Sequence, residues 1–141
     1  MQLFQSEGYR NLAHTVFRVG VGAAYSTHGA QKLFGLFGGT DGNGATANLM
    51  SMYGAAGVIE LVGGLLVMVG LFTRLAAFIA SGEMAAAYFI AHVANGGLFW
   101  WGNRGELAMV YCFAFLAISA LGAGPLSADA AMSKGRSGDG R

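Results

Sequence analysis

Apolar residues gather in four long stretches along the chain, at residues 12–30, 53–72, 75–93 and 106–121. A helix needs about 20 mostly apolar residues to cross the hydrocarbon core of a membrane, and these stretches come close to that length. Each is also rich in Gly and Ala, which allow helices to pack closely inside a membrane. The pattern predicts an all-α protein built as a four-helix transmembrane bundle.

Three of the four stretches carry an ionisable residue near the middle: Arg18, Glu60 and Glu83. A charge at the centre of a bilayer costs roughly 2.5 to 3.5 kcal/mol or more, so these side chains should face the protein interior. We expect a buried charge network of the three residues, with Arg18 and Glu60 as the preferred pair. Two interpretations stay open: the charges only fix the packing of the bundle, or a carboxylate such as Glu83 exchanges protons.

Composition supports a membrane protein, since 55% of the residues are hydrophobic, 11% are charged and the mean hydropathy is +0.52. The net charge is +1 and no basic stripe is present, which argues against a nucleic-acid partner. A single cysteine, Cys112, excludes an internal disulfide and a cysteine-based metal site. No motif for haem, an iron–sulfur cluster or a nucleotide is present, so no metal site is expected.

Basic residues outside the spans predict the orientation, because Lys and Arg are more frequent on the cytoplasmic side of a membrane protein. The side that carries both termini has five of them and the opposite side has two: Arg10, Arg74, Lys134, Arg136 and Arg141 against Lys32 and Arg104. Both termini are therefore expected in the cytoplasm, with the chain integral to the inner membrane. Residues 1–11 form an N-terminal segment, and residues 127–141 read as a flexible C-terminal tail.

A second group of polar residues lies near the exterior ends of the helices. His28 and Lys32 are one helical turn apart, as are Tyr88 and His92, while Gln31 lies beside the first pair and Glu106 opens the fourth helix. Imidazole and ammonium groups beside an aromatic rim suit the head group of a quinone, whose carbonyl oxygens accept hydrogen bonds. The alternative is that these side chains only extend to water at the membrane surface.

The order and spacing of several motifs resemble one known family. The matching residues are Arg18, His28–Gly35, Glu60–Gly64, Gly70–Arg74, His92, Gly105–Glu106, Gly122–Ser127 and Asp129. In these residues the chain resembles the DoxX family of small four-helix membrane proteins, over about residues 12 to 129. The resemblance implies a DoxX-like four-helix domain at residues 12–126.

The DoxX family includes a quinone-linked thiosulfate oxidoreductase subunit, a subunit linked to oxidative-stress complexes, and many members without an assigned activity. Membership therefore does not settle function. The resemblance agrees with the residue-level reasoning on Arg18, Glu60, His28 and Lys32 as positions of interest, and it implies no bound metal. The sequence lacks a second domain to carry electrons from a soluble donor, so we expect a partner.

The leading hypothesis is an accessory membrane subunit of a quinone-linked or respiratory redox complex, with a quinone- or lipid-contacting pocket at the exterior face. No autonomous catalytic motif or catalytic residue is evident, so the chain would be at most a subunit of an oxidoreductase. The expected partners are membrane lipids and other membrane or redox subunits, and the cofactor would be a quinone that is not covalently bound. The alternatives are a structural or assembly protein, and a small-solute or proton carrier that depends on Glu83.

Overall fold

The computed structural model describes residue 4 and residues 6–138, and these residues form helices and no strands. The elements are α2 (Glu7–Phe34), the 3-10 turn η1 (Leu36–Gly38), α3 (Met52–Val69), α4 (Thr73–Ala87), the π-helical segment η2 (Tyr88–Val93), α5 (Ala94–Gly96), α6 (Trp100–Asn103), α7 (Glu106–Leu121) and α8 (Ala128–Gly138). Each apolar stretch of the sequence coincides with a helix or with most of one. The all-α class is confirmed.

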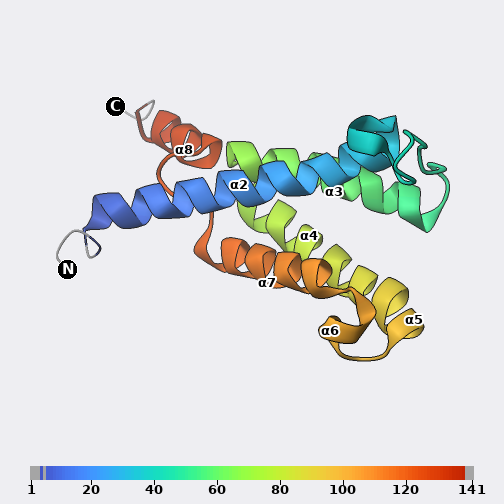
Figure 1. Cartoon of the computed structure of the whole chain (residues 1–141). Helices are drawn as coiled ribbons and strands as arrows, with labels where there is room; N and C mark the ends of the chain where they lie inside the picture. The colour runs from blue at the N-terminus through green and yellow to red at the C-terminus, as the bar shows by residue number, and fades with distance from the viewer. Residues whose placement is uncertain (1–3, 5, 139–141) are drawn as a thin grey trace.

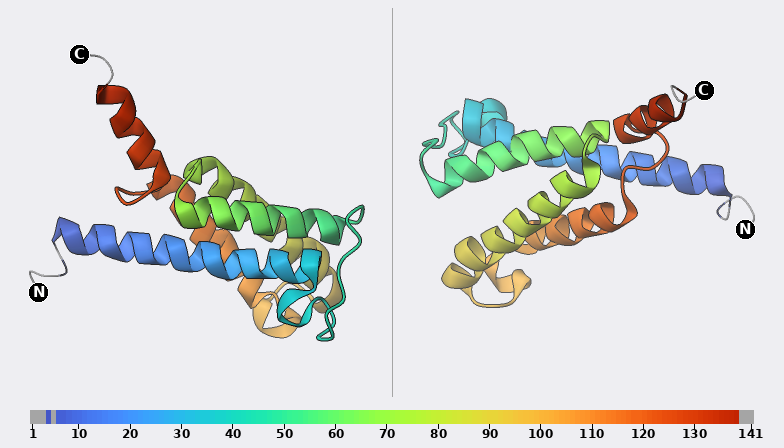
Figure 2. Two further views of the ribbon diagram at one scale, coloured as in Figure 1. Left: turned by 90° about the horizontal axis from the view of Figure 1, so that it is seen from above. Right: turned by 180° about the vertical axis from the view of Figure 1, so that it is seen from behind.

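The long helices form two layers (Figure 1). Helices α2 and α3 run antiparallel as one layer, and α4 and α7 form the other. The layers lie close together near the short α3–α4 turn and diverge towards the end that carries η1, α5 and α6 (Figure 2). This divergence positions the candidate site described below.

Glycines bring the backbones of α2 and α3 into direct contact. A Cβ atom added at Gly29 would lie 2.3 Å from the Leu61 nitrogen and 2.7 Å from the Gly57 oxygen. One added at Gly22 would lie 2.7 Å from the Gly64 oxygen. Only a residue without a side chain permits such approach. These contacts fix the antiparallel register, with Gly22 opposite Gly64 and Gly29 opposite Gly57.

Arg18 lies at the end of the protein where the two helix layers converge. Its guanidinium donates hydrogen bonds to the backbone oxygens of Val67 (2.6 Å), Met68 (2.7 Å) and Leu126 (2.8 Å), and the residue is 1% exposed. The last carbonyls of a helix lack partners within the helix, and a cation there is favourable. The expected Arg18–Glu60 pair does not form, because the register of α2 against α3 places Arg18 beside the end of α3.

The segment after α7 is also docked at this end. Where the sequence predicted a flexible tail from residue 127, the structure has helix α8, with the Ser127 hydroxyl accepting from the Ala130 nitrogen at 3.2 Å. The Asp129 carboxylate accepts from the nitrogens of Phe72 (2.8 Å) and Thr73 (3.0 Å), which lie at the start of α4 and have no acceptor within that helix. The rest of α8 projects away from the body (Figure 2). Arg141, used in the charge count, lies outside the described residues.

The Asp129 contacts predict a pH dependence of stability. Partial burial raises the pKa of this carboxyl, but the N–H groups of Thr73 and Phe72 and the charge of Arg18 lower it by more, so the pKa lies below its usual value. A lowered carboxyl pKa stabilises the fold above the unfolded-state pKa of about 3.9, and this contribution is lost as pH falls through the folded-state pKa.

Asparagine does not titrate, so Asp129→Asn should lose the pH-dependent part of the stability that the Asp129 carboxylate contributes. Loss of a helix cap costs about 0.5–2 kcal/mol. Thermal unfolding in mild detergent at pH 6 and pH 3 measures the difference between wild type and variant. We expect the wild type to lose more stability than Asp129→Asn over this range. Equal losses would contradict the proposed role of the carboxylate.

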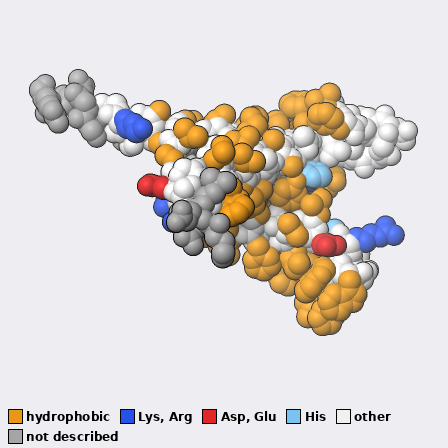
Figure 3. All heavy atoms as spheres, turned by 60° about the vertical axis from the view of Figure 1, so that its left-hand side comes forward, with side chains coloured by type: hydrophobic (Ala, Val, Ile, Leu, Met, Phe, Trp, Pro, Cys, Tyr) orange, Lys and Arg blue, Asp and Glu red, His pale blue; other side chains and the backbone are white. Residues whose placement is uncertain are grey.

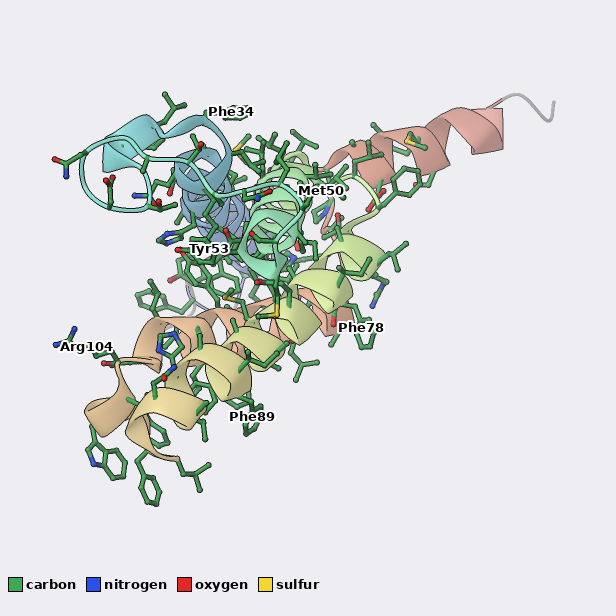
Figure 4. All side chains as sticks on the ribbon, turned by 90° about the vertical axis from the view of Figure 1, so that its right-hand side faces the viewer. Phe34, Met50, Tyr53, Phe78, Phe89 and Arg104 are labelled. Atoms are coloured by element: carbon green, nitrogen blue, oxygen red, sulfur yellow. The ribbon has the colours of Figure 1, made fainter. Side chains whose placement is uncertain are left out.

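Large apolar side chains cover the outside of the protein, whereas the charged residues Arg18 and Glu60 are buried inside it. Val16, Phe78 and Phe113 are 62%, 65% and 61% exposed, while Glu60 is 2% exposed. Apolar side chains cover much of the face in Figure 3, and Phe78 and Phe89 point away from the body in Figure 4. Among the described residues, the helices Met52–Val69 and Thr73–Gly96 are long and apolar enough to cross a membrane, and Glu106–Leu121 is apolar but shorter. This distribution suits lipid as the surrounding solvent.

Candidate functional site: an amphiphilic cavity between the two helix layers

A cavity of about 390 Å³ lies between the two layers, towards the end where they diverge. Helices α2 and α3 supply one wall, and α4, η2 and α7 supply the other. Figure 4 shows Tyr53 between the layers. Apolar groups such as Met52, Ala56, Met84 and Leu107 make up much of the lining, and a limited set of polar groups lies among them. This mixture is typical of ligand pockets.

An ion pair between Lys32 and Glu60 lies in the α2–α3 wall. The Lys32 ammonium donates a hydrogen bond to Glu60 Oε1, and Lys32 Nζ also lies 4.6 Å from the ring centroid of Tyr53. Glu60 Oε2 is buried and receives no hydrogen bond from any described residue. Lys32, expected to be a separate pocket residue, is thus the charge partner of Glu60.

A second polar contact joins the two layers. The Tyr25 hydroxyl donates to Glu83 Oε2 at 2.7 Å, which connects α2 with α4. Tyr25 is fully buried, with its ring centroid 4.6 Å from that of Phe115 and 5.5 Å from that of Tyr111. Both Tyr25 and Glu83 line the cavity. The three charges predicted as one network therefore separate into Glu60 and Glu83 at the cavity and Arg18 at the converging end.

His28 and Gln31 complete the α2 side of the lining. His28 Nδ1 lies 3.1 Å from Gln31 Oε1, so the ring nitrogen is the donor, and the imidazole meets the Tyr111 ring edge-on at 5.9 Å. Gln31 Nε2 donates to the Phe37 oxygen at 3.4 Å. Tyr25, His28 and Lys32 are spaced at i, i+3 and i+7, which places them on one helical face.

The π-helical segment η2 brings His92 to the cavity. In a regular α-helix residues nine positions apart, such as Glu83 and His92, point in roughly opposite directions. The wider π turn rotates the following residues, and both side chains line the cavity. His92 Nδ1 donates to the Asn103 oxygen at 3.1 Å. Such insertions occur frequently at functional sites.

The structure places the six residues of the sequence-predicted pocket in two groups. His28, Gln31, Lys32 and His92 line the cavity, whereas Tyr88 and Glu106 are not part of its lining. Tyr88 is a core residue, and its hydroxyl donates to the Leu98 oxygen. Glu106 is exposed at the start of α7.

Sequence reasoning missed several lining residues: Tyr25, Tyr53, Arg104 and Tyr111. Arg104 adopts a left-handed backbone conformation (φ 60°) just before α7, and its side chain is exposed. Helical spacing from His28 could have indicated Tyr25 as a lining residue. No pattern in the sequence around Arg104 or Tyr111 indicates that either residue lines the cavity. Within residues 6–138 and at residue 4, no group of three or more His, Cys, Asp or Glu side chains is arranged to hold a metal ion.

The fold and the cavity define a small helical protein with an apolar exterior and an amphiphilic cavity between its helices. The DoxX family model matches residues 13–93, more than half of the chain. A protein of Haemophilus influenzae, described as an uncharacterized protein, is 43% identical over 126 residues, which cover 87% of this chain and 92% of that protein. The chain belongs to the DoxX family, which is membrane-associated. No solved structure matches it.

Proposed function

We propose that this protein is an accessory membrane subunit of a quinone-linked redox complex, and that its cavity receives the quinone head group. The observation that carries the proposal is the amphiphilic cavity, in which Lys32, His28 and His92 lie among apolar walls. A quinone carbonyl accepts a hydrogen bond from the Lys32 ammonium, and its ring packs against apolar side chains.

The proposed topology has four spans in the inner membrane: α2, α3, the continuous helix Thr73–Gly96, and α7. Arg10, Arg74 and Lys134 lie towards the end that carries α8, while Lys32 and Arg104 lie towards the other end. The positive-inside rule then places both termini in the cytoplasm. The cavity would lie in the exterior half of the membrane.

The proposal includes a partner protein. Quinone reduction and oxidation each move two electrons, and none of the side chains that line the cavity is a two-electron carrier. A second subunit would therefore deliver or remove the electrons. The large apolar side chains exposed on the helices offer surface for other membrane helices as well as for lipid.

Purification in mild detergent, followed by mass spectrometry of everything that co-purifies, tests this role. We expect a bound quinone and stoichiometric redox subunits. A solitary protein that holds only phospholipid would contradict the proposal and favour an independent carrier or an assembly factor.

Binding of ubiquinone-1 tests the cavity itself. A ligand at 100 times its dissociation constant stabilises a protein by about 2.7 kcal/mol, so we expect a clear rise in the melting temperature of the wild type. The double variant Lys32→Met, Glu60→Gln removes the ion pair without leaving one charge buried alone and should lose this rise. Lys134→Met, exposed in α8, is the control and should keep it. An unchanged rise in the double variant would place the quinone elsewhere.

A further inference from the structure

The buried carboxylate of Glu60 uses only half of its hydrogen-bonding capacity. Oε1 accepts from the Lys32 ammonium, while Oε2 is buried and accepts from no described residue. A buried acceptor without a donor is costly, so native structures rarely leave one unpaired. Because Glu60 lines the cavity, a ligand there can supply the missing donor after a small side-chain adjustment.

This part of the cavity offers an acceptor and a donor side by side. The Lys32 ammonium has three hydrogens, of which one is directed to Glu60 Oε1, so it can also donate to a ligand. The carboxylate beside it can only accept. A hydroxyl group both donates and accepts and thus satisfies the two partners at once. A quinone carbonyl only accepts, and it would leave Glu60 Oε2 without a donor.

We propose that the cavity selects the reduced, hydroquinone form of its ligand, with one hydroxyl donating to Glu60 Oε2 and accepting from Lys32. This inference rests on the proposed function, because it names the redox form of the quinone bound at the same site. It concerns binding alone. Glu83 places a second carboxylate on the opposite wall, where its Oε2 accepts from Tyr25.

The charges around the cavity argue against an organic cation as the donor. Glu60 and Glu83 contribute two negative charges, and Lys32 and Arg104 contribute two positive ones. The lining therefore has no excess of negative charge that would attract a cation. A neutral molecule with a hydroxyl group suits a lining in which positive and negative charges are equal in number.

The test compares ubiquinol-1 with ubiquinone-1 as ligands of the full-length protein in mild detergent, under anaerobic conditions that keep each form stable. A hydrogen bond to a charged group corresponds to about a tenfold difference in affinity. We expect ubiquinol-1 to bind about tenfold more tightly than ubiquinone-1. Equal affinities, or tighter binding of ubiquinone-1, would overturn the inference.

Glu60→Gln provides the second comparison. The amide both donates and accepts, so it can serve a carbonyl as well as a hydroxyl, and the preference for ubiquinol-1 should disappear. Glu7→Gln, exposed at the start of α2, is the matched control and should retain the preference. A preference that persists in Glu60→Gln would refute the role of Oε2. If Glu60→Gln does not fold, the comparison of ubiquinol-1 with ubiquinone-1 on the wild-type protein decides whether the inference holds.

The outcomes separate this inference from the function on which it rests. Binding of ubiquinone-1 that is as tight as that of ubiquinol-1, and that is lost in the Lys32→Met, Glu60→Gln double variant, would support the proposed function and refute selection of the reduced form. Absence of binding by both forms would refute both. Tighter binding of ubiquinol-1 that depends on Glu60 would support both.

Discussion

Gly29→Ala should destabilise the protein by about 3 kcal/mol, at the upper end of the usual cost of overpacking. The added methyl group would lie 2.3 Å from the Leu61 nitrogen and 2.7 Å from the Gly57 oxygen. Both are backbone atoms, so no side-chain rotation relieves the contact. The two helices must move apart, and the interface that places Lys32 beside Glu60 would open.

Gly20→Ala is the matched control, since Gly20 lies in the same helix and has nothing within 4 Å of an added Cβ atom. It should be neutral or stabilising by up to about 1 kcal/mol, because alanine favours a helix over glycine. Unfolding of both variants in a denaturing-detergent titration gives the two values. Equal stability of Gly29→Ala and wild type would refute the close α2–α3 contact.

Arg18→Leu should cost about 3 kcal/mol or more. The substitution leaves the carbonyl oxygens of Val67, Met68 and Leu126 without the charged donor that they share. The Val67 oxygen keeps the Gly70 N–H as a donor at 3.2 Å, so the loss falls mainly on the Met68 and Leu126 oxygens, and each buried acceptor left unpaired costs about 1–3 kcal/mol. The loss would loosen the converging end of the two layers, where α2, the end of α3 and the segment before α8 meet.

Arg74→Leu separates the effect of burial from that of the hydrogen bonds. Arg74 also donates to three backbone oxygens, those of Ser119, Ala120 and Leu121 at the end of α7, but its side chain is exposed. Water can replace these bonds, so the cost should stay below about 1 kcal/mol. Melting temperatures of the two variants in mild detergent provide the comparison. Similar losses of stability in Arg18→Leu and Arg74→Leu would contradict the claim that burial makes the loss of Arg18 costly.

The helices were predictable because their signal is local. A run of apolar residues defines each long helix, and the breaks between helices fall at glycine-rich segments such as Gly38–Gly44. The pairing of charges was not predictable in the same way, because it depends on the register of α2 against α3. Gly22 lies opposite Gly64, which places Arg18 opposite Met68, so Arg18 and Glu60 are offset by about eight residues, or about 12 Å along the layer.

The candidate site was predictable only in part, because helical spacing reveals some of the lining residues and not others. His28 and Lys32 share a helical face that spacing reveals, and both line the cavity. His92 reaches it only through a π-helical insertion, and Tyr88 turns into the core instead. No simple periodicity in the sequence marks such an insertion. Helix α8 was missed because its composition suggests a tail, although Ser127 at its start and Asp129 in its first turn are typical of a helix beginning.

The bond between Arg18 and the Leu126 oxygen has a consequence for biogenesis. The two residues are 108 positions apart. At about 5–20 residues per second, a ribosome needs roughly 5 to 20 seconds to synthesise that interval. During this time the arginine of the first helix lacks one of its final partners. Synthesis of the segment between α7 and α8, rather than formation of the first helix, would thus be the event that locks the nascent chain into its mature form.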